Sequence, residues 1–97
     1  MSRISIKPTG HRTHPKGYPV DPEKYGDPVN FKYPLDTKKR IRAAISYFNH
    51  HGMRVKVRYS LDEWQTIGRR ICEAANDKLK NGDHIVGKSG RIQVLAA

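Results

Sequence analysis

The sequence contains a single cysteine, Cys72, and no long apolar segment. One thiol cannot form an internal disulfide or a zinc site that needs several cysteines, and its place beside Ile71 predicts a buried side chain. No apolar run approaches the roughly 20 residues that cross a bilayer, and the N-terminus lacks the apolar core of a secretory signal. We therefore expect a cytoplasmic protein that does not enter the membrane.

Acidic residues are scarce as well. Nine Asp and Glu stand against nineteen Lys and Arg, which gives a net charge of +10. This balance favours polyanionic partners, because Lys and Arg contacts to phosphates release condensed counterions. A basic but merely solvated domain would have the same composition, since net charge governs association and not fold. Nucleic acid is therefore one expected partner.

Proline is absent beyond residue 34, and all six prolines lie in residues 1–34. Proline removes a backbone donor and disfavours helix interiors and central strands, so we expect a Pro/Gly-rich arm followed by one domain over residues 35–97. Half of the aromatic residues lie in this arm: Tyr18, Tyr25, Phe31 and Tyr33. We expect residues 25–33 to lie across the folded part, while residues 1–17 stay mobile.

The strongest helix pattern covers residues 60–79. Ser60 and Glu63 form a capping box, in which each side chain satisfies a backbone N–H of the first turn. Apolar residues then recur at spacings of three and four and form one stripe: Trp64, Ile67, Ile71, Ala74, Ala75 and Leu79. This pattern predicts a helix at the centre of the core. Its charged residues are explained by capping and by pairing on the exposed face.

A first helix is predicted from Asp36, which has the residue type of an N-cap, to Gly52, which is typical of a helix stop. Its apolar stripe consists of Ile41, Ala44, Ile45 and Phe48. The first turns carry several cations, which oppose the helix dipole. They indicate either an anionic ligand near this end or a solvated face.

Residues 53–59 alternate between apolar and basic side chains, which predicts a half-buried strand. Its outer face would carry three cations: Arg54, Lys56 and Arg58. Such a face fits an anion-binding surface. It equally fits a sheet edge that is protected against pairing with another chain.

Two short β-prone runs, His84–Val86 and Arg91–Leu95, flank a Gly-Lys-Ser-Gly turn and predict a hairpin. Residues 82–89 also match the phosphate-loop pattern G-x-x-x-x-G-K-S. That loop should follow a strand and open a helix, whereas here it follows a helix and leads into a strand. The hairpin is the interpretation that we adopt.

The predicted fold is α+β, with two helices packed on a small, mainly antiparallel sheet in the order α-β-α-β-β after the Pro-rich arm. A winged-helix-like arrangement is the alternative, in which Gly68 would break the second helix. A continuous apolar stripe across Gly68 argues against a break, although Gly costs about 1 kcal/mol there relative to Ala.

No catalytic constellation is recognisable, and we expect a protein that is not an enzyme and needs no cofactor. The histidines lack carboxylate or cysteine partners at a ligand spacing, so no metal site is expected. The function expected from the residues is nucleic-acid binding by a basic surface. Its candidate residues are Arg54, Lys56, Arg58, Lys88, Arg91, Lys38, Lys39 and Arg42.

The other expected function is protein interaction, through the aromatic residues of the arm or through an exposed strand edge. The sequence does not specify the oligomeric state.

Three stretches belong together: a Lys-Tyr-Pro-Leu-Asp entry within residues 25–36, an Arg-Ala-Ala-Ile core within residues 40–49, and a second helix with a Ser-x-x-Glu cap that continues through residues 69–75. Over residues 25–76 they resemble a small uncharacterised module of bacteriophage and prophage proteins, sometimes found beside head-maturation proteases. The resemblance implies a bacterial or phage-related accessory domain of unknown function and supplies no catalytic residues.

Overall fold

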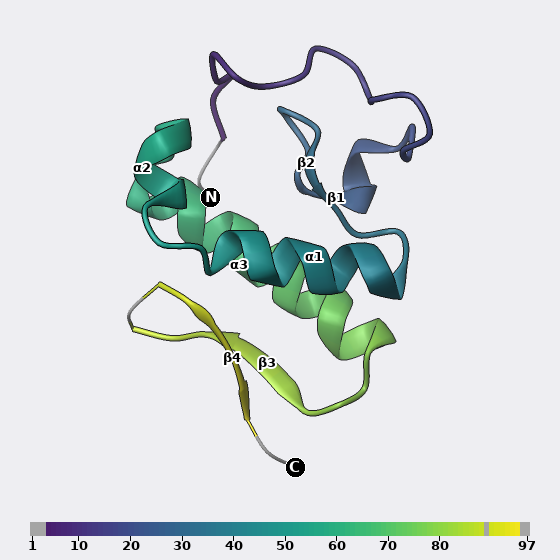
Figure 1. Ribbon diagram of the computed structural model, residues 1–97, viewed down its shortest axis with the longest axis vertical. Coiled ribbons are helices and arrows are strands. Elements are labelled where there is room, and N and C mark those ends of the chain that lie inside the picture. The colour runs from purple at the N-terminus through teal and green to yellow at the C-terminus, as the bar shows by residue number, and fades with distance from the viewer. Residues whose placement is uncertain (1–3, 89, 96–97) are drawn as a thin grey trace.

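Two long helices lie between two β-hairpins in the computed structural model, which describes residues 4–88 and 90–95 (Figure 1). The long helices α1 and α3 pack against each other, and the short helix α2 connects them. In chain order the elements are the 3-10 turn η1 (Pro22–Lys24), β1 (Tyr25–Asp27), β2 (Lys32–Pro34), α1 (Lys38–Phe48), α2 (Met53–Val57), α3 (Leu61–Lys78), β3 (Asp83–Val86) and β4 (Ile92–Leu95).

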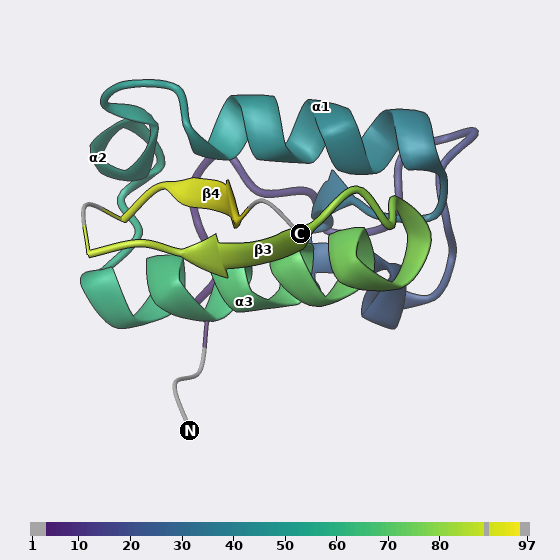
Figure 2. The same cartoon turned by 90° about the horizontal axis from the view of Figure 1, so that it is seen from below.

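The strands form two separate antiparallel pairs on opposite sides of the helices. β1 pairs with β2, and β3 pairs with β4, with Asp83 opposite Leu95 and Val86 opposite Ile92. Seen from below, the β3–β4 hairpin lies in front, between α1 and α3 and running roughly along them, and the β1–β2 hairpin lies behind the helices (Figure 2). The α+β class is therefore confirmed, whereas the expected single sheet is wrong, because each hairpin covers its own face of the helix pair.

Helix α3 follows the prediction closely. Ser60 Oγ accepts a hydrogen bond from the Glu63 N–H at 3.1 Å, and Glu63 Oε1 accepts one from the Ser60 N–H at 2.7 Å, so the capping box is complete. The helix runs through Gly68 without a break, which excludes the winged-helix alternative. The apolar stripe forms the core with α1 and includes the buried residues Trp64, Ile67, Ile71 and Ala75.

The strand predicted over residues 53–59 is wrong, because Met53–Val57 form helix α2. Met53 and Val57 are spaced by four and would share a face in a strand or in a helix. Val55 lies between them in the sequence and would share that face only in a strand. It is 66% exposed, as the helix requires. Gly52 (φ 78°) and Arg58 (φ 67°) both adopt the left-handed conformation and bracket the helix. Both hairpins pair internally, so neither supplies a partner strand to this segment.

Helix α1 begins one residue later than predicted. Thr37, and not Asp36, is the N-cap, and its Oγ1 accepts a hydrogen bond from the Arg40 N–H at 3.1 Å. Asp36 instead forms an ion pair with the Arg40 guanidinium at 2.8 Å. One of the cations at this helix start is thus explained by an internal contact. Gly52 does not stop α1 directly, since the helix ends before Asn49.

The Pro-rich segment packs on the helices along much of its length. Tyr25, Asp27 and Asn30 are buried, so this part of the expected residues 25–33 packs into the molecule. Ile4 and Lys7 are also buried, so contacts with the body begin well before residue 17. Mobility of the first residues stays a prediction.

Gly68 occupies the point where α3 approaches both α1 and β3. A Cβ atom there would lie 2.8 Å from Cζ of Phe48 and 2.7 Å from Cγ2 of Val86, both closer than van der Waals contact allows. Phe48 cannot easily give way, because its ring stacks on Trp64 with centroids 4.0 Å apart. The close approach therefore explains a glycine in the middle of a helix.

We expect Gly68→Ala to lower the free energy of unfolding. Overpacking costs about 1–3 kcal/mol, which exceeds the roughly 1 kcal/mol gained in helix propensity. Urea unfolding of the variant measures the difference, and a Val86→Ala background, which removes one of the clashing groups, should reduce the loss. A more stable Gly68→Ala protein would contradict the packing argument.

Candidate nucleic-acid interface

A cavity of about 440 Å³ opens between the α1–α2 connection, the start of α3 and the turn of the β3–β4 hairpin. These segments lie at the same end of the molecule in both ribbon views (Figures 1 and 2). We call this cavity the basic groove. Its lining residues include no carboxylate in the described part of the chain, and five of them are histidine, arginine or lysine: His50, His51, Arg54, Lys88 and Arg91.

The groove brings together three residues predicted for binding: Arg54, Lys88 and Arg91. Lys88 and Arg91 are exposed in the hairpin turn, and their side chains have no hydrogen bond or ion pair to other described residues. Arg54 is half-buried and donates from Nη1 to the Tyr59 carbonyl at 3.0 Å, which fixes its guanidinium near the end of α2. A guanidinium has five N–H donors, so this bond leaves donors for an anion.

Asn49 at the end of α1 holds the two walls of the groove in register. Its Nδ2 donates to the Ile92 carbonyl at 3.0 Å, and its Oδ1 accepts from the Ile92 N–H at 2.8 Å. The hairpin turn is closed by the Gly87 N–H, which donates to the Arg91 carbonyl at 2.8 Å. The cations of the turn are thereby positioned against α2 and not on a free loop.

The floor of the groove is apolar. Phe48 and Trp64 stack with ring planes 7° apart, and both are almost entirely buried. Their rings are therefore occupied by the core and present little surface for stacking by a ligand. The groove is consequently suited to binding a phosphate backbone by charge rather than to holding a base.

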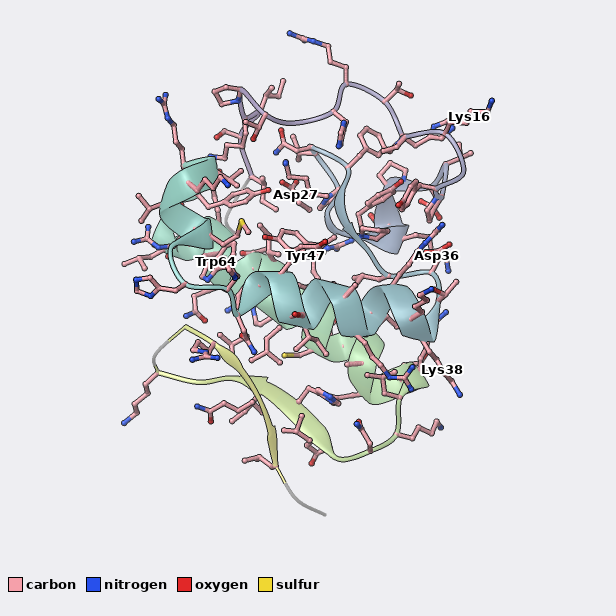
Figure 3. The ribbon with its side chains drawn as sticks, in the orientation of Figure 1. Lys16, Asp27, Asp36, Lys38, Tyr47 and Trp64 are labelled. Carbon is pink, nitrogen blue, oxygen red and sulfur yellow. The ribbon has the colours of Figure 1, made fainter. Side chains whose placement is uncertain are left out.

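The remaining predicted residues lie outside the groove. Lys56 and Arg58 are exposed on and after α2, and neither lines the groove. The other three are exposed on the first half of α1: Lys38, Lys39 and Arg42. Lys38 lies at the opposite end of α1 from Tyr47 and Trp64 (Figure 3). The predicted surface is thus divided between two ends of the molecule.

The phosphate-loop match does not form a phosphate loop over the residues described. Residues 83–86 are the extended strand β3, with no helix after it. Two backbone N–H groups that would bind phosphate are already used: that of His84 donates to Asn76 Oδ1 at 2.6 Å, and that of Gly87 closes the turn. Ser89 of the pattern lies outside the described residues.

A buried ion pair connects the N-terminal segment to the start of α3. Lys7 Nζ lies 2.7 Å from Glu63 Oε1 and also donates to Ser5 Oγ at 2.8 Å and to the Arg58 carbonyl at 3.1 Å. All three ammonium protons therefore have an acceptor. Burial alone would raise the pKa of Glu63, but hydrogen bonds from Lys7, Ser5 and Ser60 outweigh burial and lower it to about 2.

A second buried polar cluster fixes the turn between β1 and β2. Asp27 accepts hydrogen bonds from the Asn30 side chain at 2.9 Å and from the Tyr59 hydroxyl. Asn30 in turn accepts from the Lys7 N–H at 2.7 Å. Burial, together with the hydrogen bond to Asp27, raises the pKa of Tyr59 far above its ordinary value. These groups are joined to one another by internal hydrogen bonds, which fix the turn.

Sequence reasoning placed other chemistry-bearing residues differently. His50 and His51 were not among the candidate binding residues, whereas they line the basic groove. The signal available in the sequence was two adjacent histidines directly before Gly52, at the expected end of the first helix. Cys72 is buried as predicted, and burial raises the pKa of its thiol to about 11, which keeps it protonated and unreactive. Within residues 4–88 and 90–95 no cluster of His, Cys, Asp or Glu is arranged to hold a metal ion.

Comparison with known protein families gives a match over most of the chain. The sequence model of a family of unknown function (DUF6582) matches residues 13–82, well over half of the chain. No curated protein and no solved structure matches the chain significantly. None of the helices in the described part of the chain is both long and apolar enough to cross a membrane.

The lowered pKa of Glu63 makes the stability contributed by its charge dependent on pH. The contribution is complete above the ordinary pKa of 4.5 and is lost as the pH falls through about 2. Replacing Glu63 by Gln leaves the buried Lys7 ammonium unpaired, which should cost about 3–5 kcal/mol at neutral pH. Its unfolding free energy should also fall less between pH 4.5 and pH 2 than that of the parent protein.

Urea unfolding at a series of pH values measures both effects. Glu73→Gln on the exposed side of the same helix is the matched control and should change little. Equal losses in the two variants, or unchanged acid sensitivity in Glu63→Gln, would contradict the role assigned to the buried pair.

Proposed function

The chain belongs to a family of unknown function (DUF6582), and from its own geometry we propose that it is a non-enzymatic nucleic-acid-binding domain. The basic groove is the proposed contact surface. It would bind phosphates of the nucleic-acid backbone through Arg54, Lys88 and Arg91.

The observation that carries this proposal is the concentration of positive charge around one cavity without a compensating carboxylate. The molecule does contain carboxylates, but several are engaged elsewhere in the fold, as Asp27, Asp36 and Glu63 are. Exposed cations that have no internal partner are the groups that can release counterions when they meet phosphate. Lys38, Lys39 and Arg42 at the other end of α1 form a separate basic area that could extend the contact.

A second proposed function is that of a protein-interaction or assembly accessory, as the resemblance to a phage-related module implies. The β3–β4 hairpin favours it. Each strand of this hairpin has one edge that is unpaired within the described residues, and three apolar side chains on it are 40–49% exposed: Ile85, Val94 and Leu95. Such an edge can accept a strand from a partner chain.

We expect Lys88→Ala/Arg91→Ala to weaken binding of duplex DNA and RNA and to reduce its salt dependence. Each duplex phosphate contact that is lost lowers the slope of log affinity against log salt by about 0.9. Fluorescence anisotropy across a salt series, with mixed-sequence DNA and RNA, measures both the affinity and the slope.

Lys38→Ala/Lys39→Ala is the matched control, because it removes the same charge from the far end of α1. A larger loss in the Lys88/Arg91 variant supports the groove as the binding surface. Equal losses in both variants would indicate attraction by net charge alone, and no binding by the parent protein at low salt would remove the nucleic-acid proposal.

The accessory function predicts partner proteins that are still recovered with the chain after nuclease treatment. A pull-down with the intact chain from a bacterial lysate should recover them, and Val94→Lys should abolish their recovery because it places a charge on the exposed hairpin face. Partners that disappear with nuclease treatment would instead be bound through nucleic acid.

A further inference from the structure

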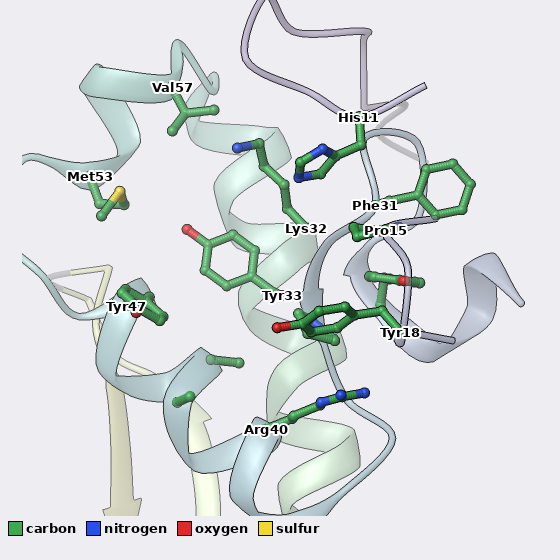
Figure 4. A pocket seen from close by; sticks show the side chains of 14 residues that line it. His11, Pro15, Tyr18, Phe31, Lys32, Tyr33, Arg40, Tyr47, Met53 and Val57 are labelled. Atoms are coloured by element: carbon green, nitrogen blue, oxygen red, sulfur yellow. The ribbon is translucent and has the colours of Figure 1, made fainter. Parts of the chain in front are cut away.

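A second cavity, of about 560 Å³, lies between α1, α2 and the N-terminal segment. Its walls are mainly aromatic and aliphatic, and Figure 4 shows Tyr18, Tyr33, Tyr47 and Met53 around it. We call it the aromatic pocket. Two of its rings remain accessible, since Tyr47 is 62% and Tyr18 is 43% exposed. They offer the open π surfaces that the basic groove lacks.

The charge around the aromatic pocket is positive. Lys32, Arg40 and His11 line it, and no carboxylate does so among the residues described. Arg40 is engaged, because it pairs with Asp36 and lies over the Tyr18 ring at 4.1 Å from the ring centre. Lys32 is different: the residue is half-buried, and its ammonium has no hydrogen bond or ion pair to any described residue. Its side chain extends from β2 toward Val57 and His11 (Figure 4).

The backbone around Lys32 is held in an unfavourable conformation. Phe31 (φ 51°) and Tyr33 (φ 61°) are both left-handed, which is rare and unfavourable for bulky residues. Packing maintains it: the Phe31 ring meets Tyr25 edge-on at 5.4 Å, and the Tyr33 ring meets Trp64 at 6.3 Å. Burial, together with the charge of Asp27, raises the pKa of Tyr33 to about 12, so its hydroxyl stays neutral.

We propose that the aromatic pocket holds an unpaired base of a single-stranded nucleic acid, with Lys32 bound to an adjacent phosphate. This inference rests on the proposed function and specifies its ligand. A single-strand site combines open aromatic rings with cations along the backbone path, and both occur here. The volume lies in the range of pockets that hold a small molecule, which is adequate for one nucleotide.

The two cavities share a lining residue, which fits the binding of one strand to both. Met53 at the start of α2 lines both of them, so they lie on either side of the α1–α2 connection. A strand whose phosphates contact the basic groove can pass over this connection and place a base in the aromatic pocket. A base within a duplex cannot enter without being unstacked and unpaired, so the pocket favours single strands.

Charge complementarity decides between the possible occupants. An uncharged apolar ligand would fill the walls but would leave the Lys32 ammonium without an anion in a half-buried position. A nucleotide supplies both a planar apolar group and a negative charge. A peptide segment carrying an aromatic side chain is the rival occupant, and the experiment includes it.

The test compares a short fluorescent single-stranded oligonucleotide with a duplex of the same length. Tyr47→Ala should weaken single-strand binding about 5- to 150-fold, the range for loss of stacking on one base, and should leave duplex binding unchanged. Tyr47→Phe retains the ring and should restore binding. Lys32→Gln should lower the single-strand salt slope by about 0.7, the value for one phosphate contact.

Two controls separate this inference from the proposed function. Val20→Ala removes a 70% exposed apolar side chain that lines neither cavity, and it should have no effect. Lys88→Ala/Arg91→Ala should weaken single-strand and duplex binding alike. If it does so while Tyr47→Ala and Lys32→Gln bind as the parent protein, the nucleic-acid function stands and the base-binding pocket is wrong.

Other results overturn the inference directly. Equal effects of Tyr47→Ala on single strands and duplexes would show that the ring does not hold a base. In NMR titrations, the ring protons of Tyr18 and Tyr47 could change chemical shift when an aromatic peptide is added and stay unchanged when a trinucleotide is added. That result would assign the pocket to a protein ligand. A parent protein that binds neither nucleic acid at low salt removes both proposals together.

Discussion

The carboxylate of Glu63 is the group on which the rest of the structure depends. A helix start leaves backbone N–H groups unsatisfied, and a capping box satisfies them with a nearby carboxylate. Here the same carboxylate also accepts hydrogen bonds from Ser5 and pairs with Lys7. Because both charges are buried, separating the pair would leave each charge buried without a counter-charge, which is unfavourable. The start of α3 and the N-terminal segment are consequently one structural unit.

That unit explains how a Pro-rich segment becomes a wall of a cavity. Once Lys7 is fixed, its backbone N–H meets Asn30, which is held by Asp27, and Asp27 is bound by the Tyr59 hydroxyl that follows α2. The Arg40 guanidinium, in turn, donates to the Gly17 carbonyl at 3.1 Å. The aromatic residues of the segment are thereby positioned against α1 by polar contacts at both ends, without the need for a long strand or helix.

The sequence is sufficient for those parts of the fold in which neighbouring residues decide the structure. The Ser60–Glu63 cap, the apolar stripe of α3 and the β3–β4 hairpin are of this kind, and all are confirmed. The segment after Gly52 is different, because its alternating pattern fits two structures. Apolar residues at every second position form one face of a strand, and those four positions apart also share one face of a helix. Only the position of Val55 distinguishes strand from helix, and tertiary packing determines that position.

The candidate sites could be anticipated only in part for a related reason. The charge composition predicts that basic side chains bind an anionic ligand. It does not predict which of them remain available once internal ion pairs have formed. Folding uses Lys7 and Arg40 in pairs with carboxylates and leaves Lys32, Lys88 and Arg91 without internal partners in the described part of the chain. These three line the two cavities that share Met53. Internal pairing therefore does more than stabilise the fold, because it decides which cations stay available to a ligand around these two cavities.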